Sequence, residues 1–420
     1  MYNNENDYRL QERKWLTIME ISEVTKDIHQ LSIELEDMLF EGIWETPEGV
    51  TLNSYIVKGE KTALVDGVCG WDGVPESFFG LMEQLKIHVR DIDYLVINHM
   101  EPDHSGWIEQ LREIRPDFKI VCTKASQLLL EAFYGYTENI MVVKDGDEVD
   151  LGNGKVLSFI TMPNVHWPDT MVTYEKSTHT LFSCDVFGAF GAIENKRYDD
   201  QLTEDELMML EEQGQRYYSN IIGPFTPFAI KGAKKLEDIE LKYIAPGHGI
   251  VWRKNPQKII DDYKRYMTYF ESPNEDEVTI IFGSMYGMTE KAVTHIIKEL
   301  EKYPVKVKVH RVPEDSWGTL LAAVWSSKNL IIAMPTYELK MFPPMAAAIE
   351  ELAKKKVLNR RVFRLGSYGW SGGAQKEFDQ IMEDNQLNWS MLEPLEFKGM
   401  ASEEDYEVIN QRIEALLTNK

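Results

Sequence analysis

Residues 98–106 constrain this chain more than any other stretch. They read NHMEPDHSG and place His99, Glu101, Asp103 and His104 within six residues. The apolar, β-branched run before them, residues 92–97, is typical of a buried strand. Pro102 should stop both strand and helix, so we expect the four side chains on a loop at a strand's end. Imidazole and carboxylate together suit first-row metals such as iron and zinc, and the stretch therefore predicts half of a metal site.

Three more candidate ligands lie farther along the same half of the chain. His166 follows the predicted strand 156–160 in MPNVHWPDT, Asp185 ends TLFSCD, and His248 follows the predicted strand 242–245 in APGHG. Loops at the carboxyl ends of strands are where α/β folds build sites. A single His or Asp there is more often a cap or turn former. Four His and three carboxylates together are enough for two metal ions with open positions.

Length and charge bound the possible functions. At 420 residues the chain should form two or more domains. The net charge of -24 argues against a nucleic-acid partner, which needs a basic surface. The basic cluster AKKKVLNRR at 353–361 is interpreted as a solvated helix end.

Targeting signals and cysteines indicate the compartment. The first residues are polar, without the apolar core of a signal peptide, and no run is long enough to span a bilayer. Cys69, Cys122 and Cys184 are far apart, which suits a reducing compartment. We expect a cytoplasmic protein with no membrane partner and, because no CxxC pair occurs, no appended iron–thiolate module.

The first half predicts many short strands with few helices. Expected strands cover 15–21, 28–33, 51–57, 61–66, 119–122 and 140–143, and expected helices cover 75–85, 107–114 and 126–133. A polar hairpin should follow from residue 145. The pattern favours an α/β layered domain in which two sheets pack between helices.

The second half predicts a different α/β arrangement. The acidic ESPNEDE at 271–277 is the best linker candidate. Strands at 278–282, 305–309, 330–334, 361–365 and near 395 alternate with helices, which indicates a five-stranded, doubly wound parallel sheet. The loops GSMYGMT, MPTYELK and GSYGWSGG leave strand ends; the first suits a phosphate, and the other two carry aromatic side chains for a flat ring. Neither GxxxxGK[ST] nor GxGxxG is present.

The ligand spacing resembles the metallo-β-lactamase-like domain of the flavodiiron proteins, also called A-type flavoproteins. The pattern is HxExDH, sixty-one residues, His, eighteen residues, Asp, sixty-two residues, His. Zinc hydrolases of this fold typically have HxHxDH, and Glu101 gives a harder, more anionic site that suits iron. The resemblance implies one iron on His99, Glu101 and His166, a second on Asp103, His104 and His248, and Asp185 between them.

The second half resembles flavodoxin and implies bound FMN. By this resemblance the phosphate contacts are Ser284, Met285, Tyr286, Gly287, Met288 and Thr289. The contacts to the ring and ribityl chain are Pro335, Thr336, Tyr337, Ser367, Tyr368, Gly369, Trp370, Ser371 and Gly372. Tyr286 departs from many simple flavodoxins, which have Ser or Thr there.

Together the resemblances imply an αββα metallo-β-lactamase-like domain at 1–272 and a flavodoxin-like domain at 277–420. The implied enzyme is an oxidoreductase that passes electrons through FMN to two irons and reduces O2 to water, NO to N2O, or both. They further imply a separate donor, either a rubredoxin-like protein or reduced deazaflavin, and a head-to-tail homodimer or a dimer of dimers. Two alternatives stay open: a dizinc hydrolase fused to a flavodoxin-like domain, and an electron carrier whose first domain binds a protein.

Overall fold

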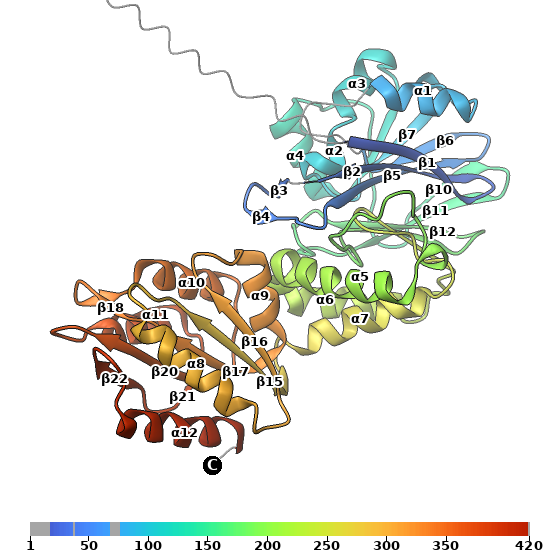
Figure 1. The fold of residues 1–420 in the computed structure, drawn as a ribbon. Helices are drawn as coiled ribbons and strands as arrows, with labels where there is room; N and C mark the ends of the chain where they lie inside the picture. The colour runs from blue at the N-terminus through green and yellow to red at the C-terminus, as the bar shows by residue number, and fades with distance from the viewer. Residues whose placement is uncertain (1–16, 37, 68–75, 419–420) are drawn as a thin grey trace, which may run out of the picture.

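The computed structural model describes residues 17–36, 38–67 and 76–418. Figure 1 shows two layered bodies that follow one another along the chain, joined near α7 (Pro256–Thr268) and β15 (Asn274–Phe282). No helix in these ranges is both long and apolar enough to cross a membrane. Cys122 and Cys184 are buried free thiols, as expected for small apolar residues; Cys69 lies outside the described residues.

The first body contains two stacked sheets. The seven-stranded sheet has the order β1-β2-β5-β6-β7-β8-β9 and the five-stranded sheet the order β10-β11-β12-β13-β14. Alternating apolar residues such as Val57, Val96, Phe159 and Phe182 are buried together between the sheets. The strands of the first sheet are β1 (Thr17–Thr25), β2 (Ile28–Leu35), β5 (Val50–Lys58), β6 (Thr62–Val65), β7 (Ile92–Val96), β8 (Lys119–Cys122) and β9 (Ile140–Val142). Those of the second are β10 (Glu148–Gly152), β11 (Lys155–Thr161), β12 (Met171–Glu175), β13 (Thr180–Cys184) and β14 (Tyr243–Pro246).

Helices cover the outer face of each sheet, which gives the predicted αββα sandwich. In Figure 1, α1 (Glu76–Gln84), α3 (Ile108–Ile114) and α4 (Lys124–Tyr134) lie on the far side of the first sheet. On the side of the second sheet lie α5 (Glu204–Tyr217), α6 (Thr226–Leu236) and α7. A short hairpin, β3 (Leu39–Phe40) and β4 (Trp44–Glu45), extends toward the second body. Residues 15 and 16 of the first expected strand and residue 75 of the first expected helix lie outside the described ranges.

The second body is the predicted doubly wound parallel sheet. Its strand order is β16-β15-β17-β20, and the fifth position is shared by two short strands that pair with successive parts of β20. One face packs on α8 and α12 and the other on α9, α10 and α11. The remaining elements are α8 (Met288–Leu300), β16 (Lys306–Arg311), α9 (Trp317–Ser326), β17 (Ser327–Ala333), α10 (Pro343–Lys354), β20 (Arg361–Tyr368), α11 (Ala374–Asn385), β21 (Ser390–Met391), β22 (Leu395–Lys398) and α12 (Glu403–Thr418).

The linker is shorter than the sequence suggested. Asn274 already pairs with Ser327 and Glu277 with Lys306, so most of ESPNEDE belongs to β15. These residues are polar and show no strand alternation, but the Glu277 carboxylate accepts a hydrogen bond from Lys308 Nζ at 2.6 Å. The prediction of a seven-residue linker was wrong because neighbouring strands, not side-chain polarity, extend the strand. The domain division at 272 and 277 stays a prediction.

The two bodies share one apolar core where they meet. Trp325 of α9 is fully buried, packs near Tyr218 and donates from Nε1 to the carbonyl of Tyr266 at 3.0 Å. Arg360 is also buried, and its guanidinium donates to the carbonyl of Trp325 at 2.7 Å and to that of Tyr269 at 3.4 Å. Hydrogen bonds of this kind between well-packed layers fix how the bodies sit relative to each other.

Candidate metal centre and cofactor loops

The first four candidate ligands lie where β7 ends and a helical turn begins. His99 follows the strand, and Glu101 directly precedes α2 (Pro102–Ser105), which carries Asp103 and His104. The sequence predicted a loop because Pro102 was taken to exclude a helix. Pro102 is instead the first helical residue, where its missing N–H needs no partner. The turn points Asp103 and His104 inward, and both are buried.

The three distant candidates follow the ends of three strands of the second sheet. His166 follows β11, Asp185 directly follows β13, and His248 follows β14. The structure brings all seven side chains to one place at the edge between the sheets. Two groups of ligand atoms form, each within 4.8 Å of one another: His99, Glu101, His166 and Asp185 in one group, and Asp103, His104 and His248 in the other.

Asp185 connects the two groups. Its Oδ2 lies 3.4 Å from His166 Nε2 in the first group. Its Oδ1 lies 3.0 Å from His104 Nε2 and 3.3 Å from His248 Nε2 in the second. Each carboxylate oxygen therefore faces a different group, which is the arrangement of a bridging ligand.

The donor set has unfilled bonding capacity. Asp103 Oδ1, Asp185 Oδ2 and His248 Nε2 are buried, and none of the three has a hydrogen-bond partner among the described residues. Buried polar atoms normally have partners, so orphans that converge on one point need an explanation. A pair of cations held by imidazole nitrogens and carboxylate oxygens supplies the missing partners.

Without cations, the charges of the site compensate one another. Burial opposes ionisation of Glu101, but hydrogen bonds with His166 and His99 lower the pKa of its carboxyl to about 2. Burial also disfavours the charged form of His166 and lowers its pKa, but the negative charges of Asp185 and Glu101 prevail and raise that pKa to about 10. The raised pKa means that the His166 imidazole binds its second proton more tightly than a free imidazole does. Binding of a metal to this imidazole would release that proton.

Residues behind the candidate ligands orient them. Asp169 Oδ1 lies 3.3 Å from His99 Nδ1, while its Oδ2 accepts from the backbone N–H of Met100 at 2.8 Å and from Ser126 Oγ at 3.1 Å. His248 Nδ1 lies 3.0 Å from the Thr51 carbonyl. Such partners leave Nε2 of each ring free for a metal.

The sequence did not predict two further contacts to the candidate ligands, one to His104 and one to Asp185. Cys184 Sγ lies 3.7 Å from His104 Nδ1, with Asp66 Oδ2 at 3.9 Å. Tyr217, fully buried at the end of α5, donates from its hydroxyl to Asp185 Oδ1 at 3.1 Å. Tyr217 is remote in sequence, and no local pattern marked it. Asp169 could have been suspected, because it follows His166 in the same loop.

The site opens beside Glu101, whose side chain is 16% exposed. The ring of Trp167 packs edge-on against that of His99, with ring centroids 4.8 Å apart. The ring centroids of Phe225 and His166 are 6.2 Å apart. The β3–β4 hairpin contributes Glu41. Burial and the negative charge of Glu101 raise the pKa of the Glu41 carboxyl.

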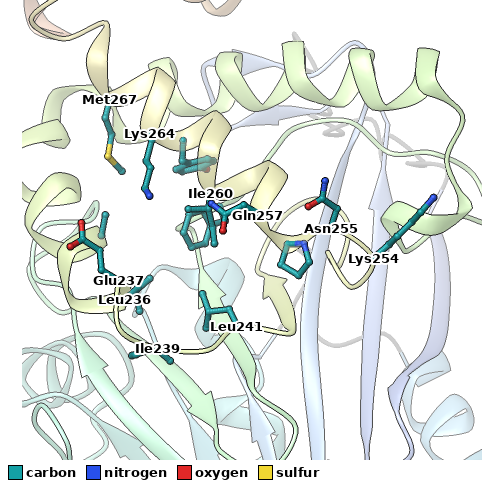
Figure 2. Close-up of a pocket in the computed structure, with 14 residues that line it drawn as sticks. Leu236, Glu237, Ile239, Leu241, Lys254, Asn255, Gln257, Ile260, Lys264 and Met267 are labelled. Atoms are coloured by element: carbon teal, nitrogen blue, oxygen red, sulfur yellow. The ribbon is translucent and has the colours of Figure 1, made fainter.

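A separate cavity of about 270 Å³ lies between α6, α7 and the β14 side of the second sheet. Figure 2 shows its wall of apolar side chains, among them Leu236, Ile239, Leu241 and Ile260. Lys264 and Glu237 also line it. None of the seven candidate ligands lines it, so the metal centre and this cavity are different places.

The candidate phosphate loop joins β15 to α8. Gly287 adopts the left-handed conformation with φ 84° that lets the chain turn into the helix, and its N–H donates to Ser284 Oγ at 3.1 Å. The amino end of α8 has no side-chain cap, and the buried Thr289 Oγ1 has no hydrogen-bond partner among the described residues. Free N–H groups at a helix start and an unpaired hydroxyl suit a phosphate. Met285 and Tyr286 are exposed residues of the loop itself, and Met288 begins the helix.

The candidate ring loops leave neighbouring strands at the same edge. After β17 comes the buried Pro335, and then Thr336 and Tyr337 form the short strand β18 (Thr336–Tyr337), which pairs with β19 (Lys340–Met341). Ser367 and Tyr368 are still part of β20, while Gly369, Trp370, Ser371 and Gly372 follow it. Thr336 Oγ1 is buried without a hydrogen-bond partner among the described residues, and Trp370 is 83% exposed. An unpaired hydroxyl and exposed aromatic rings at one edge fit a flat polar cofactor.

Family models match both halves of the chain. Residues 50–249 match the ODP family beta lactamase, and residues 280–409 match flavodoxin. The first range contains all seven candidate metal ligands, and the second contains the three loops.

Individual relatives and solved structures agree with this division. The anaerobic nitric oxide reductase flavorubredoxin of Vibrio vulnificus (strain YJ016) is 36% identical over 84% of this chain and 70% of its own length. A flavo di-iron protein from Thermotoga maritima, solved as a mutant, superposes with a TM-score of 0.87 at 29% identity, over 96% of this chain and 99% of that one. Rubredoxin oxygen:oxidoreductase from Desulfovibrio gigas superposes with a TM-score of 0.86 at 26% identity, over 95% and 98%. The sequence, the fold and the site agree, and the chain belongs to the flavodiiron proteins.

Proposed function

We propose that this chain is an oxidoreductase that reduces O2 to water, NO to N2O, or both, with electrons taken from bound FMN. The main support for this proposal is the buried cluster of four imidazoles and three carboxylates, with Glu101 where zinc hydrolases of this fold have His. A carboxylate at that position favours iron, which cycles between two oxidation states. The names of the related proteins support the reductase over the dizinc hydrolase.

We assign the seven side chains to two irons on the two groups of ligand atoms. His99, Glu101 and His166 would hold one ion and Asp103, His104 and His248 the other, with one oxygen of Asp185 on each. When bound, the two ions supply open positions for a diatomic molecule and electrons for its reduction. Tyr217 holds a proton on the hydroxyl that donates to Asp185. Trp167 shields the His99 ring from water.

We assign FMN to the three loops of the flavodoxin-like part. The start of α8, with Ser284 and Thr289, would bind the phosphate through backbone and hydroxyl donors. Thr336 would supply a hydroxyl, and Tyr337 and Trp370 would flank the ring. FMN supplies electrons one or two at a time, and the loops hold it at the sheet edge.

We propose a head-to-tail homodimer, alone or as a dimer of dimers. The shared core at Trp325 and Arg360 fixes the two bodies of one chain, so closure within the chain would break buried hydrogen bonds. Exposed apolar side chains occur on both functional edges, and such surface marks interaction sites. Beside the metal centre they are Leu39, Ile43 and Phe133; beside the flavin loops they are Met285, Tyr286, Tyr337, Leu339, Trp370 and Met400. A second copy could cover both. A fully active monomer in analytical ultracentrifugation would refute the dimer.

We propose a rubredoxin-like protein as the electron donor, which the names of the relatives support; reduced deazaflavin is the other candidate. We also propose a cytoplasmic location, because the buried thiols of Cys122 and Cys184 are free and suit a reducing compartment.

Anaerobic stopped-flow tests the proposed activity. The fully reduced, iron- and FMN-loaded protein is mixed with O2 or with NO, and flavin reoxidation is followed by its absorbance. We expect rapid reoxidation by at least one gas, with water or N2O as the product. A protein that is reoxidised only with release of superoxide or peroxide, and at equal rate after His99→Ala, would be an electron carrier.

A further inference from the structure

Lys355 reaches from the flavodoxin-like part into the metal-binding part of the same chain. It directly follows α10, and its Nζ donates to the backbone carbonyl of Asn220 at 2.6 Å. The same ammonium lies 4.5 Å from the ring centroid of Trp44, within the range of a cation–π contact. The Lys355 ammonium therefore contacts two segments of the first body, at Trp44 and at Asn220, which lie far apart in the sequence.

The first segment leads to Asp185. Asn220 lies in a π-helical turn, η3 (Tyr218–Ile222), that continues directly from Tyr217. Wide turns of this kind are rare overall and are often found at functional sites. Lys355 donates to the Asn220 carbonyl within this turn. Tyr217, at the start of this turn, donates to Asp185 Oδ1 at 3.1 Å.

The second segment leads to the opening beside Glu101. Trp44 begins β4, and its Nε1 donates to Glu41 Oε2 at 2.8 Å. The carboxyl of Glu41 interacts electrostatically with Glu101 and His166 of the metal centre and also with Lys355. The position of Trp44 thus fixes how Glu41 faces the metal centre.

Burial of the Lys355 ammonium is energetically unfavourable. Burial lowers the pKa of its ammonium, because a charge is removed from water. The carbonyl and the aromatic ring offset part of that penalty. The preceding Lys354 differs: its side chain is 68% exposed, and among the described residues its ion pair is with Glu351 on its own helix, at 3.4 Å. A lysine needed for solubility alone would resemble Lys354.

We propose that Lys355 is a positioning residue for the metal centre: through Asn220 and Trp44 it holds Tyr217 and Glu41 in place beside the ligands. The flavodoxin-like part therefore shapes the metal site of its own chain, in addition to carrying FMN. The inference rests on the proposed function only in taking the seven side chains as iron ligands.

The test compares Lys355→Met, Lys355→Arg and the matched control Lys354→Met in the full-length protein. Iron and FMN content, the thermal midpoint, the electron paramagnetic resonance spectrum of the one-electron-reduced iron pair, and kcat and KM are measured for each. Small displacements of groups at a catalytic centre can lower the reaction rate by orders of magnitude. We therefore expect kcat of Lys355→Met to fall about tenfold. Its spectrum should shift while both cofactors remain, Lys355→Arg should recover most of both, and Lys354→Met should match the wild type.

An unshifted spectrum and unchanged kcat in folded Lys355→Met would overturn the inference. If that variant does not fold, Trp44→Phe decides, because it keeps a ring under the ammonium and removes only the N–H to Glu41. A shifted spectrum then supports the proposal and an unshifted one defeats it. A wild-type protein without any two-iron spectrum would instead defeat the proposed function.

Discussion

Replacing Asp169 by Asn should weaken metal binding without changing the size of the side chain. Asp169 accepts three hydrogen bonds at once: from Met100 N–H, from Ser126 Oγ and at His99 Nδ1. An amide has one acceptor oxygen and one donor nitrogen. If its NH2 faces Met100, two donors oppose each other. If it faces His99, Nδ1 must accept, the ring proton moves to Nε2, and that nitrogen can no longer bind a metal.

The expected size of the effect follows from the role of such partners. Losing an outer hydrogen bond to a ligating His weakens metal affinity by about 10–100-fold. This corresponds to about 1.4–2.8 kcal/mol of binding free energy. The loss should fall on the iron held by His99, Glu101 and His166, because Asp169 contacts none of the ligands of the other group among the described residues.

Chelator competition measures this loss. The purified Asp169→Asn protein is titrated with a ferrous chelator under anaerobic conditions, and retained iron is counted against FMN and protein. We expect one iron per chain to leave at about 10–100-fold lower chelator concentration. Asp117→Asn serves as the matched control, since the Asp117 side chain is 81% exposed. Wild-type iron retention in Asp169→Asn would refute the reasoning.

Three further predictions follow from the site. Glu101→His restores the hydrolase-like pattern, so the protein should retain zinc in place of iron and lose gas reduction, as metal analysis and stopped-flow would reveal; unchanged iron content would contradict this. Thr289→Val removes a buried hydroxyl that has no hydrogen-bond partner in the described part of the chain, and the FMN dissociation constant should rise at least about tenfold, measured by quenching of flavin fluorescence. In the metal-free protein, burial lowers the pKa of His99, but Asp169 and Glu101 raise it from 6.5 to about 8. Its stabilising contribution, up to about 2 kcal/mol, is complete below pH 6.5 and should disappear as pH rises through 8; urea midpoints that stay constant over this range would refute it.

The fold and the candidate ligands could be predicted from the sequence because short stretches of sequence indicate them. Apolar runs followed by turn residues marked the strands, and the crowding of His99, Glu101, Asp103 and His104 within six residues marked the site. Strand ends also indicated where the remaining candidates would lie, since parallel strands expose their carboxyl ends together.

The features that could not be predicted from the sequence depend on contacts between residues far apart in the chain. Pro102 was taken as a helix breaker, yet it begins a helical turn. Glu277 seemed part of a linker, yet Lys308 holds it in β15. Tyr217 ends α5 and Lys355 directly follows α10, and the sequence patterns of these helices resemble those of ordinary solvated or packed helices. Their partners, Asp185 and Asn220, are brought to them only when the helices dock.

The metal content of the protein tests the central claim most directly. Protein produced with iron and zinc both available is purified without air, and its metals are counted per chain beside its FMN. The Mössbauer spectrum of iron-57 protein then shows whether the ions are coupled. We predict two coupled irons and one FMN per chain. Two zinc ions, or a single iron with no coupled partner, would contradict the account.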